Sequence, residues 1–141
     1  MKILVLGGSG GMGRYVVKSL YKYKKIHKIL VADLNELAAK EFASNFDHRV
    51  EGMGLNVSNS LALKETMLKA DIIVNTTGPF FKLAKSILEA AIETRRHYFD
   101  ICDDWEPTEA MLQMNEDAKK ANITAIIGLG ASPGLTNILA H

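Results

Sequence analysis

Apolar and polar residues alternate along the chain in two kinds of segment. Short runs rich in Ile, Leu and Val predict β-strands, whereas stretches with apolar residues three or four positions apart predict amphipathic helices. The predicted strands are Lys2–Leu6, Lys28–Ala32, Arg49–Leu55, Asp71–Thr76, His97–Asp100 and Ile123–Ile127. The predicted helices are one with Met12, Tyr15, Val16, Ser19, Leu20 and Tyr23 on its buried face, then Asn35–Phe46, Asn59–Ala70, Lys82–Thr94 and Pro107–Ala121.

The alternation of strands and helices predicts βαβ units and therefore a parallel sheet. The strands are nearly continuous apolar runs, as expected when helices cover both faces of a sheet. Six strands with right-handed crossovers fit an α/β, doubly wound parallel sheet in the order 3-2-1-4-5-6. The 141 residues suit one domain, residues 1–141. A helical pattern starts at Leu135 and has barely begun at His141, so we expect a domain truncated from a longer chain.

Composition narrows the classes of function. Seventeen Lys and Arg residues against sixteen Asp and Glu residues give a net charge of +1, which offers no electrostatic attraction for nucleic acid or an anionic membrane. The single cysteine permits no internal disulfide, and the four His residues are scattered, so we expect no metal site. We find neither a secretory signal nor a membrane-spanning run, and we therefore expect a cytoplasmic protein.

A glycine-rich turn follows the first predicted strand. Gly8, Gly10 and Gly13 satisfy the pattern G-x-G-x-x-G between that strand and the first helix. In such a turn Gly8 permits the tight bend, Gly10 lets the backbone approach a pyrophosphate, and Gly13 lets the helix pack on the strand. Free N–H groups at the helix start then attract phosphate, the alternative being a tight turn that binds nothing. The predicted contacts with a dinucleotide are Gly8, Ser9, Gly10, Gly11 and Met12.

Asp33 ends the second predicted strand, twenty residues after Gly13. A carboxylate in this place accepts hydrogen bonds from both ribose hydroxyls of an adenosine, and it repels a 2′-phosphate. We therefore predict NAD in preference to NADP. Arg14 is the counter-argument, because a guanidinium near the turn favours additional phosphate, but Arg14 also fits a solvated surface position.

Asn56 and Val57 follow the third predicted strand, where an adenine would lie. Both positions are at the carboxyl end of a strand, which is the side of an open α/β sheet where ligands bind. The amide of Asn56 suits the edge of the base, and the side chain of Val57 suits its face. The alternative is that Asn56 or Ser58 caps the next helix.

Further loops follow strands four and six at the same edge of the predicted sheet. A hydroxyl and backbone groups after strand four are placed to follow a nicotinamide ribose, unless these residues form an ordinary turn. The glycine-rich segment 128–134, after strand six, lets the backbone pass close to a flat ring. The predicted cofactor contacts after strand four are Thr76, Thr77, Gly78 and Pro79.

Asp100 and Asp103 are the predicted catalytic residues. They follow the fifth strand, where carboxylates are placed to orient a cationic amine or to move a proton. The alternative for Asp103 and Asp104 is that they precede and cap the next helix. Cys102 fits a small buried residue better than a nucleophile.

Tyr21 and Lys25 form the Tyr-x-x-x-Lys pair that is typical of short-chain dehydrogenases. They lie at the far end of the first predicted helix. At a rise of 1.5 Å per residue, this places them roughly 15 Å from the glycine turn. We therefore interpret the pair as a solvated helix end without a catalytic role.

With these loops in place, the chain resembles the N-terminal NAD(P)-binding Rossmann domain of the saccharopine dehydrogenase family. The glycine turn is shared with many dehydrogenases, whereas the Thr-Gly-Pro, Tyr-x-Asp and Ser-Pro-Gly-x-Thr-Asn pieces are more specific. The matching segments, in chain order, are Gly7–Gly13, Ala32–Asn35, Asn75–Phe80, His97–Asp100 and Gly130–Asn137.

The resemblance implies a two-part enzyme that transfers hydride reversibly at an amine-bearing carbon, with an amino acid or related amine as substrate. The cofactor domain would bind NAD(P), and a later domain, absent here, would hold substrate and form a homodimer interface. Asp100 and Asp103 would then lie on the substrate side. A regulatory NAD-sensing domain without catalysis is the alternative, because it shares the glycine turn and Asp33. The resemblance implies cofactor contacts at Gly8, Gly10, Gly11, Met12, Asp33, Thr77, Gly78 and Pro79.

Overall fold

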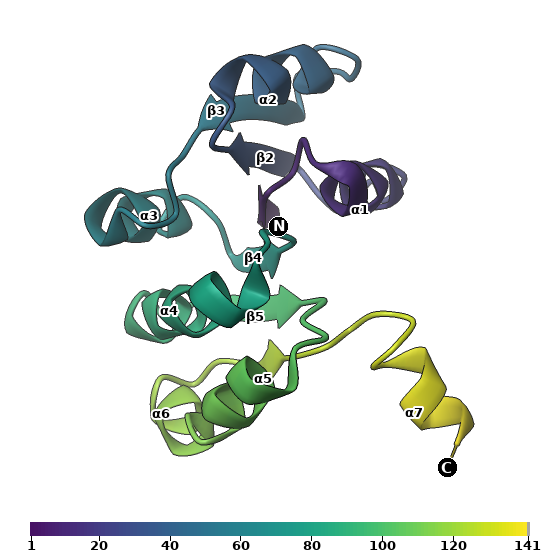
Figure 1. Cartoon of the computed structure of the whole chain (residues 1–141). Coiled ribbons are helices and arrows are strands. Elements are labelled where there is room, and N and C mark those ends of the chain that lie inside the picture. The colour runs from purple at the N-terminus through teal and green to yellow at the C-terminus, as the bar shows by residue number, and fades with distance from the viewer. Residues whose placement is uncertain (141) are drawn as a thin grey trace.

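The computed structural model describes residues 1–140 and consists of one sheet flanked by helices (Figure 1). The strands are β1 (Lys2–Leu6), β2 (Lys28–Asp33), β3 (Val50–Gly54), β4 (Ile72–Asn75), β5 (His97–Asp100) and β6 (Ala125–Ile126). The helices are α1 (Gly11–Tyr21), α2 (Glu36–Ala43), α3 (Ser60–Met67), α4 (Phe80–Glu93), α5 (Trp105–Leu112), α6 (Asn115–Lys120) and α7 (Leu135–Leu139). All the strand pairs are parallel, in the order β3-β2-β1-β4-β5-β6. The predicted doubly wound α/β sheet is therefore confirmed.

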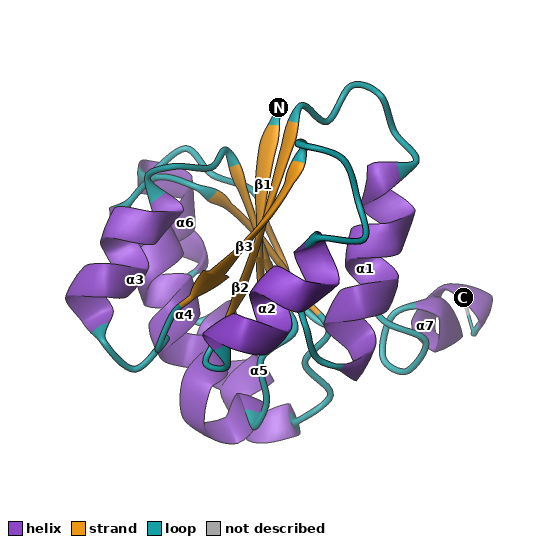
Figure 2. Ribbon diagram, turned by 90° about the horizontal axis from the view of Figure 1, so that it is seen from above, coloured by secondary structure: helices purple, strands orange, loops and turns teal. Residues whose placement is uncertain are grey.

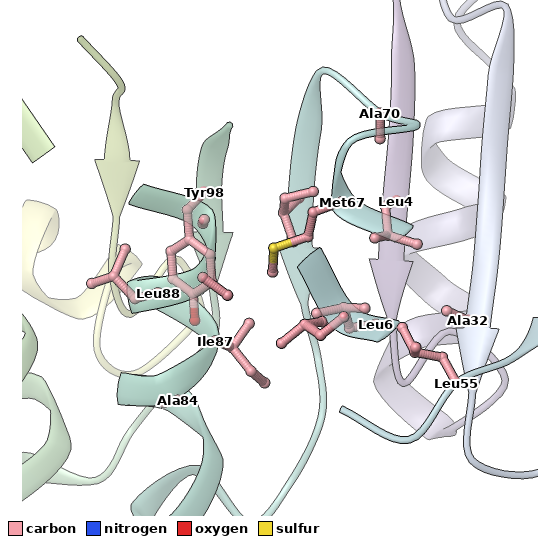
Figure 3. Packing of buried hydrophobic residues seen from close by; sticks show 14 of the residues in the cluster. Leu4, Leu6, Ala32, Leu55, Met67, Ala70, Ala84, Ile87, Leu88 and Tyr98 are labelled. Carbon is pink, nitrogen blue, oxygen red and sulfur yellow. The ribbon is translucent and has the colours of Figure 1, made fainter. Parts of the chain in front are cut away.

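Helices cover both faces of the sheet (Figure 2). Because side chains alternate along a strand, Ile3 and Val5 are buried in a core with α1 and α2, whereas Leu4 and Leu6 face the opposite core. That larger core is filled by side chains of α3, α4 and α5, and Figure 3 shows Met67 of α3 beside the Leu residues of β1. The two cores hold the carboxyl ends of β1 to β5 at one edge of the sheet, where the connecting loops meet.

The buried face of α1 agrees with the prediction only in part, since Val16 and Leu20 pack, half-buried, against the core. Gly13 and Val17 are its buried residues, whereas Tyr15 is 70% exposed and Met12 is 55% exposed. Tyr23 lies beyond the end of the helix and is also exposed. The reason is that a glycine at position 13 lets the helix approach β1 closely, so the side that carries it faces inward. Apolar residues are common on protein surfaces, and their spacing alone does not identify the buried side.

The predicted helix Pro107–Ala121 is divided into α5 and α6, which are separated by Gln113 and Met114. α5 also begins two residues earlier than predicted, at Trp105. No residue of α6 is buried, so no apolar face holds it in line with α5. Within residues 1–140, no helix is long and apolar enough to cross a membrane.

Candidate functional site

A cavity of about 340 Å³ opens at the carboxyl edge of the sheet, beside the ends of β1, β2 and β4. The connections from β1 and β4 run to opposite faces of the sheet here, which is where ligands bind in doubly wound folds. A larger hollow of about 510 Å³ lies against α1, but its lining is almost wholly apolar, so it lacks the donors and acceptors that a polar ligand requires. The predicted cofactor residues that line the first cavity are Gly10, Asp33, Asn56, Val57, Thr76, Thr77 and Gly78.

The glycine turn is shaped by close approaches of backbone to backbone. A Cβ added to Gly13 would lie 2.2 Å from the carbonyl oxygen of Gly7, and one added to Gly8 would lie 3.0 Å from the carbonyl oxygen of Val5. The positive φ of +70° belongs to Gly7, so Gly7 makes the bend that was assigned to Gly8 from the sequence. Gly8 is needed instead for its contact with β1 and β2. The turn therefore uses one more glycine than the G-x-G-x-x-G pattern contains.

The start of α1 offers backbone donors beside this turn. Arg14 N–H donates to the carbonyl of Gly10 at 3.0 Å, so the helical hydrogen-bond pattern begins there. The N–H groups of the first helical residues, Gly11, Met12 and Gly13, precede that pattern. Together with the partial positive charge at a helix N-terminus, these groups have the chemistry that suits phosphate oxygens.

The carboxylate of Asp33 lies against the same turn. One oxygen accepts from Ser9 N–H and the other from Asn35 N–H, both at 3.2 Å. The turn and the carboxylate are thus held together before any ligand binds. Arg14 lies on the outer side, where its Nε donates to the carbonyl of Ser9 at 2.6 Å and its guanidinium stacks on Phe42, 4.9 Å from the ring centroid. The contact with Phe42 was not predicted from the sequence.

The loop after β3, where the sequence predicts an adenine contact, lines one side of the cavity. Asn56 Oδ1 accepts from Ser58 N–H at 3.0 Å, which fixes the turn, and Val57 packs against the larger core. The residue that caps α3 is Asn59, whose side chain accepts from Ala62 N–H at 3.1 Å. The capping alternative for Asn56 and Ser58 is therefore wrong.

The loop after β4 places two hydroxyls differently. Thr76 donates its hydroxyl to the carbonyl of Leu6 at 2.7 Å, which ties β4 to the end of β1. The hydroxyl of Thr77 is buried beside the cavity and has no hydrogen-bond partner among residues 1–140. Gly78 has open space around its Cβ position, and Pro79 precedes α4. An unpartnered buried hydroxyl costs free energy, so this group is suited to a ligand that completes its hydrogen bonds.

Asp100 is 1% exposed and serves as a hydrogen-bond acceptor inside the protein. One carboxylate oxygen accepts from the N–H groups of Cys102 and Gly128, at 3.1 and 2.8 Å, and the other accepts from the Tyr98 hydroxyl at 2.8 Å. Burial and the neighbouring Asp100 carboxylate raise the pKa of Tyr98 well above its usual value of 10.0. This arrangement favours a structural role for Asp100 over the catalytic role that was predicted from the sequence.

The other acidic residues after β5 are closer to the surface. Asp103 is exposed, and Asp104 accepts from Phe81 N–H at 3.1 Å, so its carboxylate caps α4 and not α5. Cys102 is fully buried, and burial raises the pKa of its thiol above 9.0, as expected for a packing residue. Within residues 1–140, His, Cys, Asp and Glu side chains form no cluster able to hold a metal ion.

Tyr21 and Lys25 lie outside the cavity, as the helix length predicts. The hydroxyl of Tyr21 donates to Asp47 at 3.0 Å, and its ring packs edge-on against Phe46 and under the guanidinium of Arg49. These contacts attach the end of α1 to the loop between α2 and β3. Sequence reasoning also missed Asn75 and Tyr98, two buried polar residues behind the cavity, although both lie in segments that carry the family resemblance.

Solved structures with a similar fold include two proteins described as dehydrogenases. Saccharopine dehydrogenase (L-Glu forming) from Saccharomyces cerevisiae, in its apo form, superimposes with a TM-score of 0.84 at 20% identity, over 99% of this chain and 29% of the yeast chain. Quinate dehydrogenase from Corynebacterium glutamicum, in complex with NAD, gives a TM-score of 0.62 at 19% identity, over 90% of this chain and 44% of that one. At these identities the likeness establishes the fold.

Sequence comparison establishes the family. A protein of Caenorhabditis elegans described as a lipid droplet localized protein is 25% identical over an alignment of 141 positions, which covers 91% of this chain and 32% of that protein. The chain thus spans about a third of the length of these relatives. Residues 3–126 match the family model described as the saccharopine dehydrogenase NADP binding domain. The chain therefore belongs to the saccharopine dehydrogenase family and comprises its NAD(P)-binding Rossmann domain.

Proposed function

We propose that the 340 Å³ cavity binds NAD(H) and that the protein transfers hydride at an amine-bearing carbon of an amino acid or related amine. The observation that carries the proposal is that one cavity joins the glycine turn, the Asp33 carboxylate and the unpartnered hydroxyl of Thr77. These three features match the pyrophosphate, the adenosine ribose and the second ribose of a dinucleotide. The residues present therefore fit the cofactor that the family implies.

The cavity, together with the start of α1 next to Gly10, would hold the successive parts of the cofactor. The N–H groups of Gly11 and Met12 bind pyrophosphate oxygens, and Asp33 accepts from the ribose hydroxyls. Asn56 and Val57 hold the adenine, while Thr77 and Gly78 position the nicotinamide half. When bound, the nicotinamide supplies the hydride chemistry, and this chain binds, orients and shields it from water.

The preference for NAD over NADP rests on Asp33. Its carboxylate lies beside the turn, where it repels a 2′-phosphate by a few kcal/mol per unit charge at an effective dielectric constant of about 20. The guanidinium of Arg14, which would favour that phosphate, is held by the Ser9 carbonyl and the Phe42 ring. We therefore expect the carboxylate of Asp33, and not the guanidinium of Arg14, to determine which cofactor binds more tightly.

Fluorescence titration of the chain with NADH and NADPH tests this proposal. We expect NADH to bind at least about tenfold more tightly, which corresponds to about 1.4 kcal/mol. Asp33→Asn retains an acceptor for Ser9 N–H but removes the negative charge. The difference between the affinities for NADH and NADPH should therefore become smaller. Tighter binding of NADPH to the wild type would overturn the preference, and binding of neither nucleotide would overturn the proposed function.

The relatives are about three times as long as this chain, which leaves room in them for a further domain that binds substrate. We propose that the amine substrate and a homodimer interface belong to a second domain outside these residues, and that the protein is cytoplasmic. Exposed Asp103 is the remaining acidic candidate on the substrate side. The chain alone is then expected to bind cofactor without steady-state turnover of lysine or saccharopine.

The unpartnered hydroxyl of Thr77 favours an enzyme over a regulatory NAD-sensing domain. A regulatory domain has no need to position the nicotinamide end of the cofactor.

A further inference from the structure

A continuous set of hydrogen bonds, buried except at its partly buried Thr77 end, joins the loop after β4 to the loop after β6 by way of β5. Thr77 N–H donates to Asn75 Oδ1 at 3.0 Å, and the Asn75 amide donates to the Tyr98 hydroxyl, also at 3.0 Å. The Tyr98 hydroxyl donates to Asp100 Oδ2 at 2.8 Å. The other oxygen of Asp100 accepts from Gly128 N–H at 2.8 Å. Every link in this series has a donor and an acceptor.

The set is built from side chains that water does not reach. Asn75 and Tyr98 are fully buried, and Asp100 is nearly so. Parallel pairing places Asn75 of β4 opposite Asp100 of β5, so the contact depends on the register of the sheet. Buried polar groups are costly unless all of them are bonded, and a fully bonded network is correspondingly rigid. The loops at its two ends are therefore held in one arrangement.

We propose that Asn75, Tyr98 and Asp100 are positioning residues that fix the loop after β4 against the nicotinamide half of a bound dinucleotide. This inference rests on the proposed function. Because Thr77 N–H is bonded inward to Asn75, its unpartnered hydroxyl is left beside the cavity. Asp100 thereby acts through other residues and does not itself touch the cofactor.

The hydrogen bonds that hold Asp33, on the adenosine side, do not involve Asn75, Tyr98 or Asp100. Asp33 is held by Ser9 and Asn35, which belong to the turn after β1 and the loop after β2. Loss of a hydrogen bond in the Asn75–Tyr98–Asp100 set is therefore expected to weaken binding of a complete dinucleotide and to leave binding of ADP unchanged. A purely structural role would change both affinities together or neither of them.

Tyr98→Phe tests this in the 141-residue chain, because it removes one hydroxyl and keeps the ring in the core. We expect the Kd for NADH to rise about fivefold, because the two hydrogen bonds of the Tyr98 hydroxyl are lost and the loop after β4 is held less firmly. The Kd for ADP, measured by competition, should change less than twofold. Tyr23→Phe, which removes a hydroxyl from an exposed ring, is the matched control and should leave the Kd for NADH and the Kd for ADP unchanged. Amide hydrogen exchange gives a second readout, in which the amides of Thr77 and Gly128 should exchange faster in Tyr98→Phe while that of Val31 should not.

The outcomes separate the two claims. Wild-type chain that binds neither NADH nor ADP would overturn the proposed function, and the inference with it. Wild-type binding with an unchanged ratio of NADH to ADP affinity in Tyr98→Phe would overturn the inference alone. An equal loss of both affinities would show that the network only supports the fold, and it too would overturn the inference. Should Tyr98→Phe fail to fold, Asp100→Asn undergoes the same comparison.

Discussion

Two regions at the carboxyl edge of the sheet are built in opposite ways. The turn between β1 and α1 is shaped by the absence of side chains, since a Cβ on Gly13 would lie 2.2 Å from a carbonyl oxygen of the same turn. The ends of β4 and β5 are shaped by three buried polar side chains, Asn75, Tyr98 and Asp100, which bond to one another and to the backbone. The first region has no room for an added carbon at Gly13, and the second has no spare partner for its buried polar groups.

This difference predicts how each region responds to change. The glycine turn from Gly7 to Gly13 has no ionisable side chain, and its shape is set by close contacts between backbone atoms. The polar network depends on desolvated hydrogen bonds, so its contribution to stability changes with each partner removed and with protonation. Substitutions at the two places should therefore differ in size and in pH dependence.

The largest expected effect is that of Asp100→Ala. It leaves the N–H groups of Cys102 and Gly128 and the hydroxyl of Tyr98 without their acceptor. At about 1–3 kcal/mol for each buried unpaired group, the free energy of unfolding should fall by about 4 kcal/mol. Urea denaturation measures this loss. Asp103→Ala, at an exposed carboxylate, is the control and should stay within about 0.5 kcal/mol of the wild type. A loss for Asp100→Ala no larger than that of the control would contradict the role of the network.

A smaller effect is expected for Gly13→Ala. The added carbon would overlap the backbone of Gly7 and Gly8, so α1 must move away from β1. Overpacking of this kind costs about 1–3 kcal/mol, and the displaced helix start should also lose affinity for NADH. Thermal unfolding and NADH titration measure the two effects. Gly11→Ala, whose Cβ would meet no atom within 4 Å, should unfold at or above the wild-type temperature. Equal unfolding temperatures for both variants would show that the turn is not sterically closed.

The smallest expected effect is a dependence on alkaline pH. In the unfolded chain Tyr98 ionises near pH 10.0, whereas burial and Asp100 keep it protonated in the folded chain. Above pH 10.0 the unfolded state therefore binds fewer protons, and the free energy of unfolding should fall as pH rises, by up to about 1.4 kcal/mol per pH unit. Urea denaturation between about pH 9 and 11 measures this slope.

Tyr98→Phe should flatten that slope, and Tyr23→Phe should leave it as in the wild type. Burial also raises the pKa of Cys102, so this thiol likewise lowers the free energy of unfolding as pH rises, beginning near pH 9.0. Cys102 is present in all three proteins, so its contribution cancels in the comparison. If the free energy of unfolding of Tyr98→Phe fell with pH as steeply as that of the wild type, burial of the Tyr98 hydroxyl beside Asp100 would be contradicted.

The sequence predicted the sheet and the glycine turn because both depend on local patterns. Strand and helix periodicities are visible within single segments, and their alternation determines the parallel topology. The G-x-G-x-x-G turn is likewise contiguous, so its place at the start of α1 followed directly. What the pattern could not show was that Gly7, outside it, has the positive φ.

The polar network was not predicted because it depends on long-range register. Asn75 and Asp100 are neighbours only because β4 and β5 pair with the residues at their ends opposite each other. From sequence alone, Asp100 was an acid after a strand and was assigned to catalysis. A usable signal was present, since Asn75 and Asp100 each end an apolar strand and Tyr98 lies two residues before Asp100 on the same side of β5.

The burial of Cys102 offers a way to measure how often the segment after β5 opens. It is the only cysteine of the chain, it is fully buried, and its own N–H donates to Asp100. A thiol reagent can reach it only during excursions in which the segment after β5 opens. Free energies of such local opening range from near zero to that of global unfolding, and the modification rate places this segment on that scale. A bound dinucleotide that stabilises these loops would slow the modification of Cys102. The modification rate of this one native thiol therefore reports how often the segment after β5 opens.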